Sequence, residues 1–488
     1  MIVTDQHGVR RRPLLRGTIT LTLPAVLLLL VLITRNLFSV ELSPTDIDQG
    51  ISGETHVDGG KVVDAEEAEE AYDANEEEDT YEAYEAPEPA PPRPELAKYP
   101  QEWMLEAAAT MAHIDNNISR FKCREAFDES FDKLRHGFIV RIEDGQMYAM
   151  AKMLPGTAAA LHMDWNQYMR ESAQPPMELR PTLWPLCRRG LIGDPTFDID
   201  FAVSVPDEPV NTIFDAAVPV FGWVKTGLDT DLLIPYPYSY NSLHSPLVSA
   251  GWDIESIGRL DQLCYNESLA HVSALWDAKI EKGIWRGSTT GTERFTTENW
   301  RDQWRPKLVK YCMEHEDVCD AAISGIVQAD GDAADEMRRE LPVGEEYRMS
   351  ELEQSEYKYA LLLDGNSAPS SRTVTALGQA SAIVKQSSPF MEFFYHSLRP
   401  YVHYLPMPNE IGEDISRVIN WAREHDDEIK QMVVRASSFK CRWLHDEIVE
   451  QYVADLVQMY ADRFHGTRGS IKTEDMIPIH IDCAFNQY

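Results

Sequence analysis

The stretch that decides the fold is YKYALLLDGNSAPSSRTVTALGQASAIVKQ, which spans residues 357–386. Its first seven residues, 357–363, are mostly apolar and predict a strand. The segment DGNSAPSS follows, and its small and capping residues are typical of a turn that leads into a helix. A helix over 372–380 and a short buried strand over 382–386 complete the stretch. This order of strand, helix and strand predicts a parallel α/β unit.

Similar patterns continue on both sides of this unit. Toward the C-terminus they predict a helix, a strand and two closing amphipathic helices, at residues 389–398, 401–406, 415–422 and 444–460. Toward the N-terminus they predict helical segments over 101–136 and 268–282 and strands over 197–205 and 217–225. Residues 99–488 are globular in composition, and we expect an α/β fold.

The loop before the predicted helix at 372–380 is a candidate phosphate site. Ligands of doubly wound sheets bind beyond the carboxyl ends of strands, where helix N-termini favour anions. Asn366 and Ser371 belong to a loop of small residues that allows close backbone approach. Arg372 lies in the first turn, where the positive end of the helix dipole repels a cation. This repulsion is offset if Arg372 binds an anion. A surface ion pair between Arg372 and Asp364 is the alternative.

A second candidate is WRGSTTGTER, residues 285–294. Arg286 and Arg294 flank a turn that contains Ser288, so the turn offers hydroxyl donors and the arginines offer charge. The stretch lacks the lysine of a Walker A loop and the glycine spacing of a dinucleotide site. A surface turn with a stacked Trp285 is the alternative.

The third candidate is the turn Pro206-Asp207-Glu208-Pro209, which follows an apolar strand. A carboxylate held in a rigid turn at a strand end suits a general base, and we expect Asp207 to fill this role. Acidic residues are common in turns, so an ordinary surface turn is the alternative.

The N-terminal region predicts a membrane anchor. Residues 17–34 carry no charge, and Arg10, Arg11, Arg12 and Arg16 precede them. The positive-inside rule keeps the N-terminus cytoplasmic and places the rest of the chain in the lumen of the endoplasmic reticulum or Golgi, as a single-pass type II protein. A cleaved signal peptide is the alternative.

An acidic segment follows the predicted anchor. The formal net charge of the chain is −35, and residues 41–97 hold 19 acidic residues against Lys61 and Arg93. This segment ends in APEPAPPRPE and predicts a disordered stem. The negative net charge argues against a nucleic-acid partner, because proteins that bind nucleic acids need a basic face.

The seven cysteines show no CxxC pair and no zinc spacing, so the sequence predicts no metal site. Cys312 and Cys319 are close enough in sequence to bridge, but their spacing does not settle whether they do.

Three stretches resemble, in this order, glycosyltransferase family 90: WRGSTTGTER, YKYALLLDGNSAPSSR and SPFMEFFYHSLRPYVHYLP. This family includes the Rumi-type protein O-glucosyltransferases, the fungal capsule-associated proteins and fungal β-1,2-xylosyltransferases. The resemblance covers roughly residues 180–465 and leaves out the anchor and stem. It implies a GT-B fold with two Rossmann-like domains around a cleft, and inversion at the anomeric carbon.

The resemblance also implies roles for single residues. Ser288 and Arg294 match donor-binding residues of the protein O-glucosyltransferases, and Arg372 ends a second donor-binding loop that contacts the diphosphate. Asp207 falls where the catalytic aspartate of the family follows a strand. No counterpart of the peptide-acceptor contacts is found. The predicted site therefore comprises Asp207 as the base and Arg286, Ser288, Arg294, Asn366, Ser371 and Arg372 as donor-binding residues.

These observations together predict an inverting glycosyltransferase that uses a UDP-sugar, with UDP-xylose favoured and UDP-glucose second. The acceptor is a hydroxyl of a glycan or glycoprotein, and no metal or other cofactor is expected. A non-catalytic glycan-binding member of the same fold and a UDP-sugar hydrolase are the alternatives. The expected divisions are a cytoplasmic tail (1–16), an anchor (17–38), a stem (39–98), an acceptor-side domain (99–270) and a nucleotide-sugar-binding domain with the closing helices (271–488).

Overall fold

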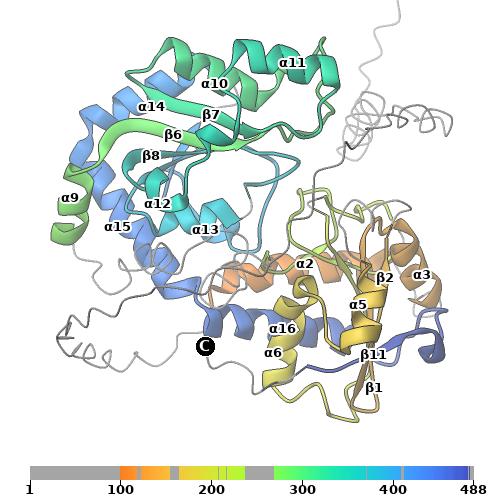
Figure 1. Cartoon of the computed structure of the whole chain (residues 1–488). Helices are drawn as coiled ribbons and strands as arrows, with labels where there is room; N and C mark the ends of the chain where they lie inside the picture. The colour runs from red at the N-terminus through yellow and green to blue at the C-terminus, as the bar shows by residue number, and fades with distance from the viewer. Residues whose placement is uncertain are drawn as a thin grey trace, which may run out of the picture. The chain divides into compact units, whose positions relative to one another are not determined.

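The computed structural model describes most of the chain from residue 99 onward (Figure 1). The described residues are 99–117, 123–153, 164–206, 208–215, 217–236, 269–369, 371–407, 411–481 and 483. The predicted tail, anchor and stem lie outside these residues, and so does Asp207. Within the described ranges, no helix has the length and apolar character needed to cross a membrane.

The stretch at 357–386 lies at the centre of a five-stranded parallel sheet, called here the C-terminal sheet. Its strands follow the order β10-β9-β8-β6-β7, and every neighbouring pair is parallel. The bounds are β6 Ile280–Ser288, β7 Cys319–Gly325, β8 Tyr357–Leu362, β9 Ala382–Gln386 and β10 Leu405–Met407. The predicted parallel α/β class is thus confirmed.

Helices cover both faces of the C-terminal sheet (Figure 1). On β8, Leu361 packs into one hydrophobic cluster, whereas Ala360 and Leu362 pack into another. This alternation is expected for a strand buried on both faces. The helices here are α9 Leu269–Asp277, α10 Trp304–Glu314, α11 Gly331–Glu340, α12 Glu351–Gln354, α13 Ser371–Leu377, α14 Glu413–Glu424 and α15 Asp426–Trp443. Short 3-10 turns lie at Trp300–Asp302, Glu345–Tyr347 and Tyr395–Ser397.

The predicted helix over 389–398 is wrong. Only the turn Tyr395–Ser397 is helical, because the backbone of Met391 makes two hydrogen bonds with Lys225 as an isolated antiparallel bridge. These bonds use the N–H and C=O groups that a helix would need. The predicted helix over 268–282 also ends early, since α9 stops at Asp277 and β6 begins at Ile280.

A second, six-stranded sheet, the N-terminal sheet, has the order β11-β2-β1-β3-β4-β5. Its strands are β1 Gly137–Glu143, β2 Gln146–Lys152, β3 Ile199–Ser204, β4 Phe221–Gly222, β5 Leu232–Leu233 and β11 Ile477–Ile479. Strands β3, β4 and β5 are parallel, but β1, β2 and β11 add antiparallel pairs. The sheet is therefore mixed, which differs from the parallel arrangement that a Rossmann-like domain implies.

The antiparallel pairing of β1 with β2 follows from a turn that the sequence analysis did not identify. Asp144 and Gly145 join β1 to β2, with φ of 50° and 72°. Positive φ at both central residues is the conformation that two-residue hairpins favour, and Asp-Gly is a preferred pair for it. The predicted strand at 217–225 is also shorter than expected, because only Phe221–Gly222 belong to a strand of this sheet.

The chain end returns to the N-terminal sheet. Helix α16, Asp446–Phe464, packs against α2 and α6, and β11 pairs with β2, although the sequence analysis assigned both segments to the C-terminal domain. The remaining elements are α2 Gln101–Asn117, α3 Cys123–Lys133, α5 Trp165–Ser172, α6 Arg180–Arg188 and the 3-10 turns Met177–Leu179 and Thr473–Asp475.

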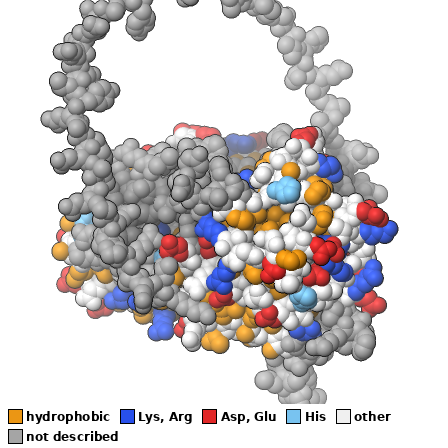
Figure 2. Space-filling model, turned by 90° about the horizontal axis from the view of Figure 1, so that it is seen from below, with side chains coloured by type: hydrophobic (Ala, Val, Ile, Leu, Met, Phe, Trp, Pro, Cys, Tyr) orange, Lys and Arg blue, Asp and Glu red, His pale blue; other side chains and the backbone are white. Residues whose placement is uncertain are grey.

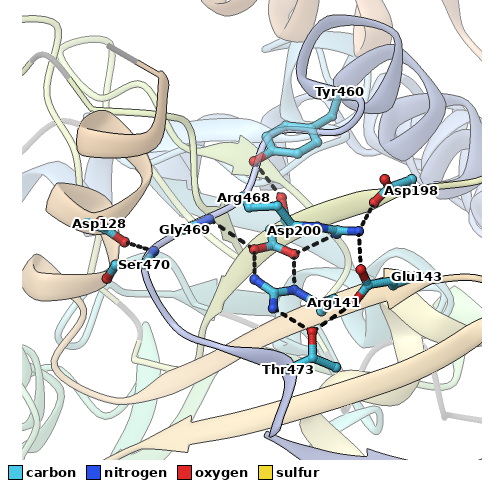
Figure 3. A network of polar contacts seen from close by, with 10 residues as sticks. All are labelled: Asp128, Arg141, Glu143, Asp198, Asp200, Tyr460, Arg468, Gly469, Ser470 and Thr473. Atoms are coloured by element: carbon cyan, nitrogen blue, oxygen red, sulfur yellow. Dashed lines mark hydrogen bonds and ion pairs between the residues drawn. The ribbon is translucent and has the colours of Figure 1, made fainter. Parts of the chain in front are cut away.

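A buried ion pair holds this returning segment in place (Figure 3). Arg141 of β1 donates two hydrogen bonds to Asp200 of β3, from Nε at 2.7 Å and from Nη2 at 2.5 Å. Arg468 and the backbone N–H of Gly469 also donate to the Asp200 carboxylate, at 3.2 and 3.1 Å. Thr473 accepts a hydrogen bond from Arg141. The segment after α16 is therefore fixed against β1 and β3.

Disulfides reinforce the fold. Cys312 is bonded to Cys319, which resolves the question that their spacing left open. Cys187 of α6 is bonded to Cys483, which attaches the end of the described chain to the N-terminal part. Cys441 is disulfide-bonded as well.

The surface carries charges of both signs. On the face that Figure 2 shows, Lys and Arg side chains are interspersed with Asp and Glu side chains. No continuous basic surface for an extended anionic partner lies on the described part of this face.

We predict that the Asp200 cluster is required for stability. Asp200→Asn leaves Arg141 buried with a neutral partner, and breaking a buried pair costs about 3–5 kcal/mol. The free energy of unfolding, measured by urea denaturation, should fall by about that amount. The control Asp332→Asn changes an exposed carboxylate of α11 and should cost less than about 0.5 kcal/mol. Equal stability of the two variants would contradict this account.

Candidate functional site

The site forms where the strand order of the C-terminal sheet reverses. The chain runs from β6 to β7 on one side and then returns to β8 on the other side of β6. In open parallel sheets, ligands bind beyond the carboxyl ends of the strands at such a point. A pocket of about 240 Å³ lies there. It is lined by Thr290, Gly291, Thr292, Phe295, Gln303, Trp304, Asp364, Gly365, Gln386, Ser387, Pro389 and Phe390.

Arg305, in the first turn of α10, joins the two central strands at this place. Its Nε donates to the backbone oxygen of Asp364 at 3.0 Å, and its Nη1 donates to the backbone oxygen of Ser288 at 2.9 Å. Nη1 also donates to the hydroxyl of Thr290. The side chain is buried, so its charge lies beneath the loops that follow β6 and β8.

Gly365 makes this close packing possible. A Cβ atom at this position would lie 2.6 Å from Oγ1 of Thr290 and 2.7 Å from Nη2 of Arg305. Such distances are shorter than ordinary contacts, so any side chain at 365 would displace the Thr290 hydroxyl or the Arg305 guanidinium from its present position.

Arg372 supplies a second guanidinium group. It lies in α13 and donates to the backbone oxygen of Arg286 in β6. Burial lowers the pKa of Arg372, and the charge of Glu351 opposes that shift. Burial, together with the charge of Arg372, lowers the pKa of Arg305 to about 9. Arginine side chains keep their proton in proteins, so both groups carry a positive charge.

The two cations lack direct carboxylate partners. Among the residues that the structure describes, neither Arg305 nor Arg372 lies within ion-pair distance of an Asp or Glu side chain. The alternative surface pair between Arg372 and Asp364 does not form. Arg305 is buried and Arg372 is partly buried. Two such like charges without paired carboxylates are costly unless an anion joins them, so the arrangement favours an anionic ligand.

The other predicted donor residues lie in different surroundings. Ser288 ends β6, and its backbone oxygen holds Arg305. The side chain of Arg286 is buried and pairs with Asp320 of β7 at 2.8 Å. Arg294 is exposed and pairs with Asp330 at 2.6 Å. The structure thus brings Ser288, Arg372 and the backbone of Arg286 together, and it places Arg294 on the surface.

Two of the predicted residues are described only in part. Asn366 is partly buried, and its Oδ1 atom is buried without a hydrogen-bond partner. Ser371 begins α13, but its side chain lies outside the described residues.

Asp207, the predicted base, lies outside the described residues, but its neighbours locate the turn. Val205 and Pro206 directly follow the buried strand β3, so the turn is at the carboxyl end of that strand. Glu208 is exposed and pairs with Arg135 at 3.2 Å. An exposed, ion-paired carboxylate is poorly suited to act as a base, so Asp207 stays the predicted base.

Sequence reasoning missed Arg305. The stretch Trp304-Arg305-Pro306 indicates a helix start, because proline is favoured in the first turn. Nothing in this pattern reveals that Arg305 is buried beneath two loops that lie far from it in sequence.

No group of three or more His, Cys, Asp or Glu side chains suited to a metal ion occurs in the described parts of the chain.

Comparison with known proteins gives the family. The model of glycosyl transferase family 90 matches residues 191–480, which is more than half of the chain. Protein O-glucosyltransferase 2 of Danio rerio is 28% identical over 269 residues, which cover 54% of this chain and 47% of the relative. Protein O-glucosyltransferase 3 of Mus musculus is 26% identical over 54% of this chain and 48% of the relative. Protein O-glucosyltransferase 1 of Homo sapiens is 24% identical, with 54% and 62% covered.

The chain spans about half to three fifths of the length of these relatives. Among solved structures, a crystal structure of Anabaena Alr3699/HepE in complex with UDP-glucose is 13% identical, with a TM-score of 0.26. That match covers 39% of this chain and 53% of the other. The family match includes the β6 loop, the β8 loop and the turn at Asp207, and the chain therefore belongs to glycosyl transferase family 90.

Proposed function

We propose that this chain is an inverting glycosyltransferase that transfers a sugar from a UDP-sugar to a hydroxyl group of a glycan or glycoprotein. The observation that carries the proposal is the pair of guanidinium groups at the carboxyl ends of β6 and β8, the buried Arg305 and the partly buried Arg372. A nucleoside diphosphate is an anion that such a pair would bind and orient.

The proposed reaction is a single displacement. Asp207 accepts the proton of the acceptor hydroxyl as its oxygen attacks the anomeric carbon. The bond from that carbon to the diphosphate breaks on the opposite face, so the configuration inverts. Negative charge develops on the diphosphate, and Arg372 and Arg305 stabilise it. Because these residues supply the positive charge, we propose that no metal ion is needed.

The identity of the sugar is part of the proposal. The names of the relatives support glucose, because all three are called O-glucosyltransferases. The sequence analysis favoured xylose, which we now rank second. A hydrolase that uses water as acceptor has the same donor site and differs only in the acceptor.

We also propose that the catalytic part lies in the lumen of the endoplasmic reticulum or Golgi, behind an anchor at residues 17–38. The Cys187–Cys483 and Cys312–Cys319 disulfides support an oxidising compartment, because such bonds are rare in the cytosol. The arginines before residue 17 support the type II orientation.

We predict that Arg372→Ala weakens UDP binding about ten- to a hundredfold in calorimetry, because it removes a charge-assisted contact. Arg372→Lys should recover only part of the affinity, since lysine lacks the planar fork. Arg294→Ala should have a smaller effect, because Arg294 is exposed and already paired. The matched control is Arg338→Ala, an exposed arginine of α11. Unchanged UDP affinity in Arg372→Ala would refute the proposed clamp.

The base is tested by transfer activity. Asp207→Asn should keep its affinity for UDP. Its rate of sugar transfer should fall by about 10²–10⁴-fold, which is the usual contribution of a positioned base. Glu208→Gln should keep most activity, because Glu208 is exposed and paired with Arg135. The reverse result would move the base to Glu208, and full activity of both variants would remove this turn from the catalytic centre.

Topology is tested by protease protection of sealed microsomes. We expect a fragment that contains residues 98–488 to survive until detergent is added. Digestion of this fragment in sealed vesicles would contradict the lumenal placement.

A further inference from the structure

The loop that carries the predicted base is fixed on both sides. Before the loop, the backbone N–H of Val205 donates to the backbone oxygen of His136 at 3.2 Å, beside the paired strands β1 and β3. After the loop, Val210 packs against an apolar cluster that consists of Leu134, Ala202 and Val220. Residues 206–209 lie between these two anchors, and two of them are prolines, whose rings restrict the backbone.

Asp231 supplies a further contact on the far side of the loop. Its carboxylate accepts hydrogen bonds from the backbone N–H groups of Val210, at 2.6 Å, and of Asn211, at 3.3 Å. The backbone N–H of Thr230 donates to the backbone oxygen of Asn211 at 2.9 Å. Asp231 directly precedes the buried strand β5 and is 1% exposed, so that strand fixes the position of its carboxylate. The chain just after the predicted base is therefore bonded to the start of β5.

The carboxylate of Asp231 is costly to bury. Burial raises the pKa of Asp231 to about 8, although the N–H group of Val210 favours the charged form. The charge of Lys225 also favours that form, but Nζ of Lys225 is bonded to Glu106 and to the hydroxyl of Thr110. In the described part of the chain, the side chain of Asp231 bonds only to the backbone of the loop. Such a cost is expected where a loop must keep one conformation, because functional side chains need supporting hydrogen bonds.

This edge of the N-terminal sheet adjoins the candidate donor pocket. Strands β3 and β4 are parallel neighbours, so the turn after β3 and the residue Lys225, which follows β4, lie at the same edge. The backbone of Lys225 makes hydrogen bonds of 3.1 and 2.8 Å with Met391, which directly follows Phe390 of the pocket lining. A shift of the turn would therefore change its distance from a donor in the pocket.

We propose that Asp231 is a positioning residue for the base of the reaction. It fixes the backbone of Val210 and Asn211, and it thereby limits the positions that Asp207 takes relative to the acceptor hydroxyl. Asp231 acts through the backbone and accepts no proton from the acceptor. The assignment rests on the proposed function, since it requires Asp207 to be the base.

The test measures UDP release from UDP-glucose by the full-length chain, with free glucose as the acceptor, and the Kd of UDP by calorimetry. Asp231→Ala removes both hydrogen bonds to the loop, so kcat should fall about ten- to a hundredfold because the base is less well oriented. The KM for UDP-glucose and the Kd of UDP should change by less than about twofold, since the donor pocket is unaffected. Asp231→Asn keeps an oxygen that accepts a hydrogen bond from the loop, so its kcat should lie between those of Asp231→Ala and the wild type.

The matched control is Asp229→Ala. Among the described residues, the side chain of Asp229 bonds only to Thr226, at 2.8 and 2.7 Å, and not to the loop of the base. The kcat of this variant should remain close to that of the wild type. The free energy of unfolding of each variant, from urea denaturation, shows whether the chain is folded under the assay conditions. Equal losses of kcat in Asp229→Ala and Asp231→Ala would overturn the proposal, because a general disturbance of this region would then explain both.

The remaining outcomes separate this assignment from the proposed function. If the wild-type chain releases no UDP, or if Asp207→Asn keeps full activity, the proposed base fails and the assignment fails with it. If Asp207→Asn is slow but Asp231→Ala keeps the wild-type kcat, only the assignment fails. If Asp231→Ala does not fold, Asp231→Asn decides, and a wild-type kcat in that variant would overturn the proposal.

Discussion

The parallel pairing of β6 with β8 is the constraint on which the site depends. Because the chain leaves β6 toward β7 and comes back beside β6 as β8, the loops that follow these strands open at one edge of the sheet. Arg305 reaches that edge from α10 and bonds to the ends of both strands. Gly365 leaves room for it. The position of the second guanidinium, from Arg372, follows from the same pairing, because its partner is a backbone oxygen of β6.

The N-terminal sheet depends on a different interaction. Its edge strand β11 comes from the end of the described chain and pairs with β2, and the segment between α16 and β11 lies against β1 and β3. The Arg141–Asp200 pair and the contacts of Arg468 and Gly469 hold this segment there (Figure 3). The Cys187–Cys483 disulfide adds a covalent link beyond β11. These contacts join segments that lie far apart in the sequence, and they stabilise the N-terminal sheet. Strand β3 of this sheet is followed in the sequence by the turn at Asp207.

The sequence predicted local features well and long-range ones poorly. β9 has the predicted bounds and β8 is one residue shorter than predicted, because an apolar run bounded by turn residues is a local signal. The helix expected over 389–398 failed because Met391 pairs with Lys225, which lies in a distant segment. The Asp144-Gly145 pair is a local hairpin signal, and it predicts the antiparallel pairing of β1 with β2 but not the pairing of β1 with β3 or of β2 with β11. Of the proposed site, Arg372 was predicted from its conflict with the helix dipole, whereas the burial of Arg305 depends on tertiary contacts that no local pattern contains.

The central claim is that Arg372 and Arg305 bind a nucleoside diphosphate at the carboxyl ends of β6 and β8. The most direct measurement is an experimental structure of the chain with UDP at saturating concentration. The account predicts the diphosphate within hydrogen-bond distance of the Arg372 guanidinium, beside the loops that follow Ser288 and Leu362. UDP bound elsewhere, with Arg372 still bonded only to the Arg286 backbone, would contradict it.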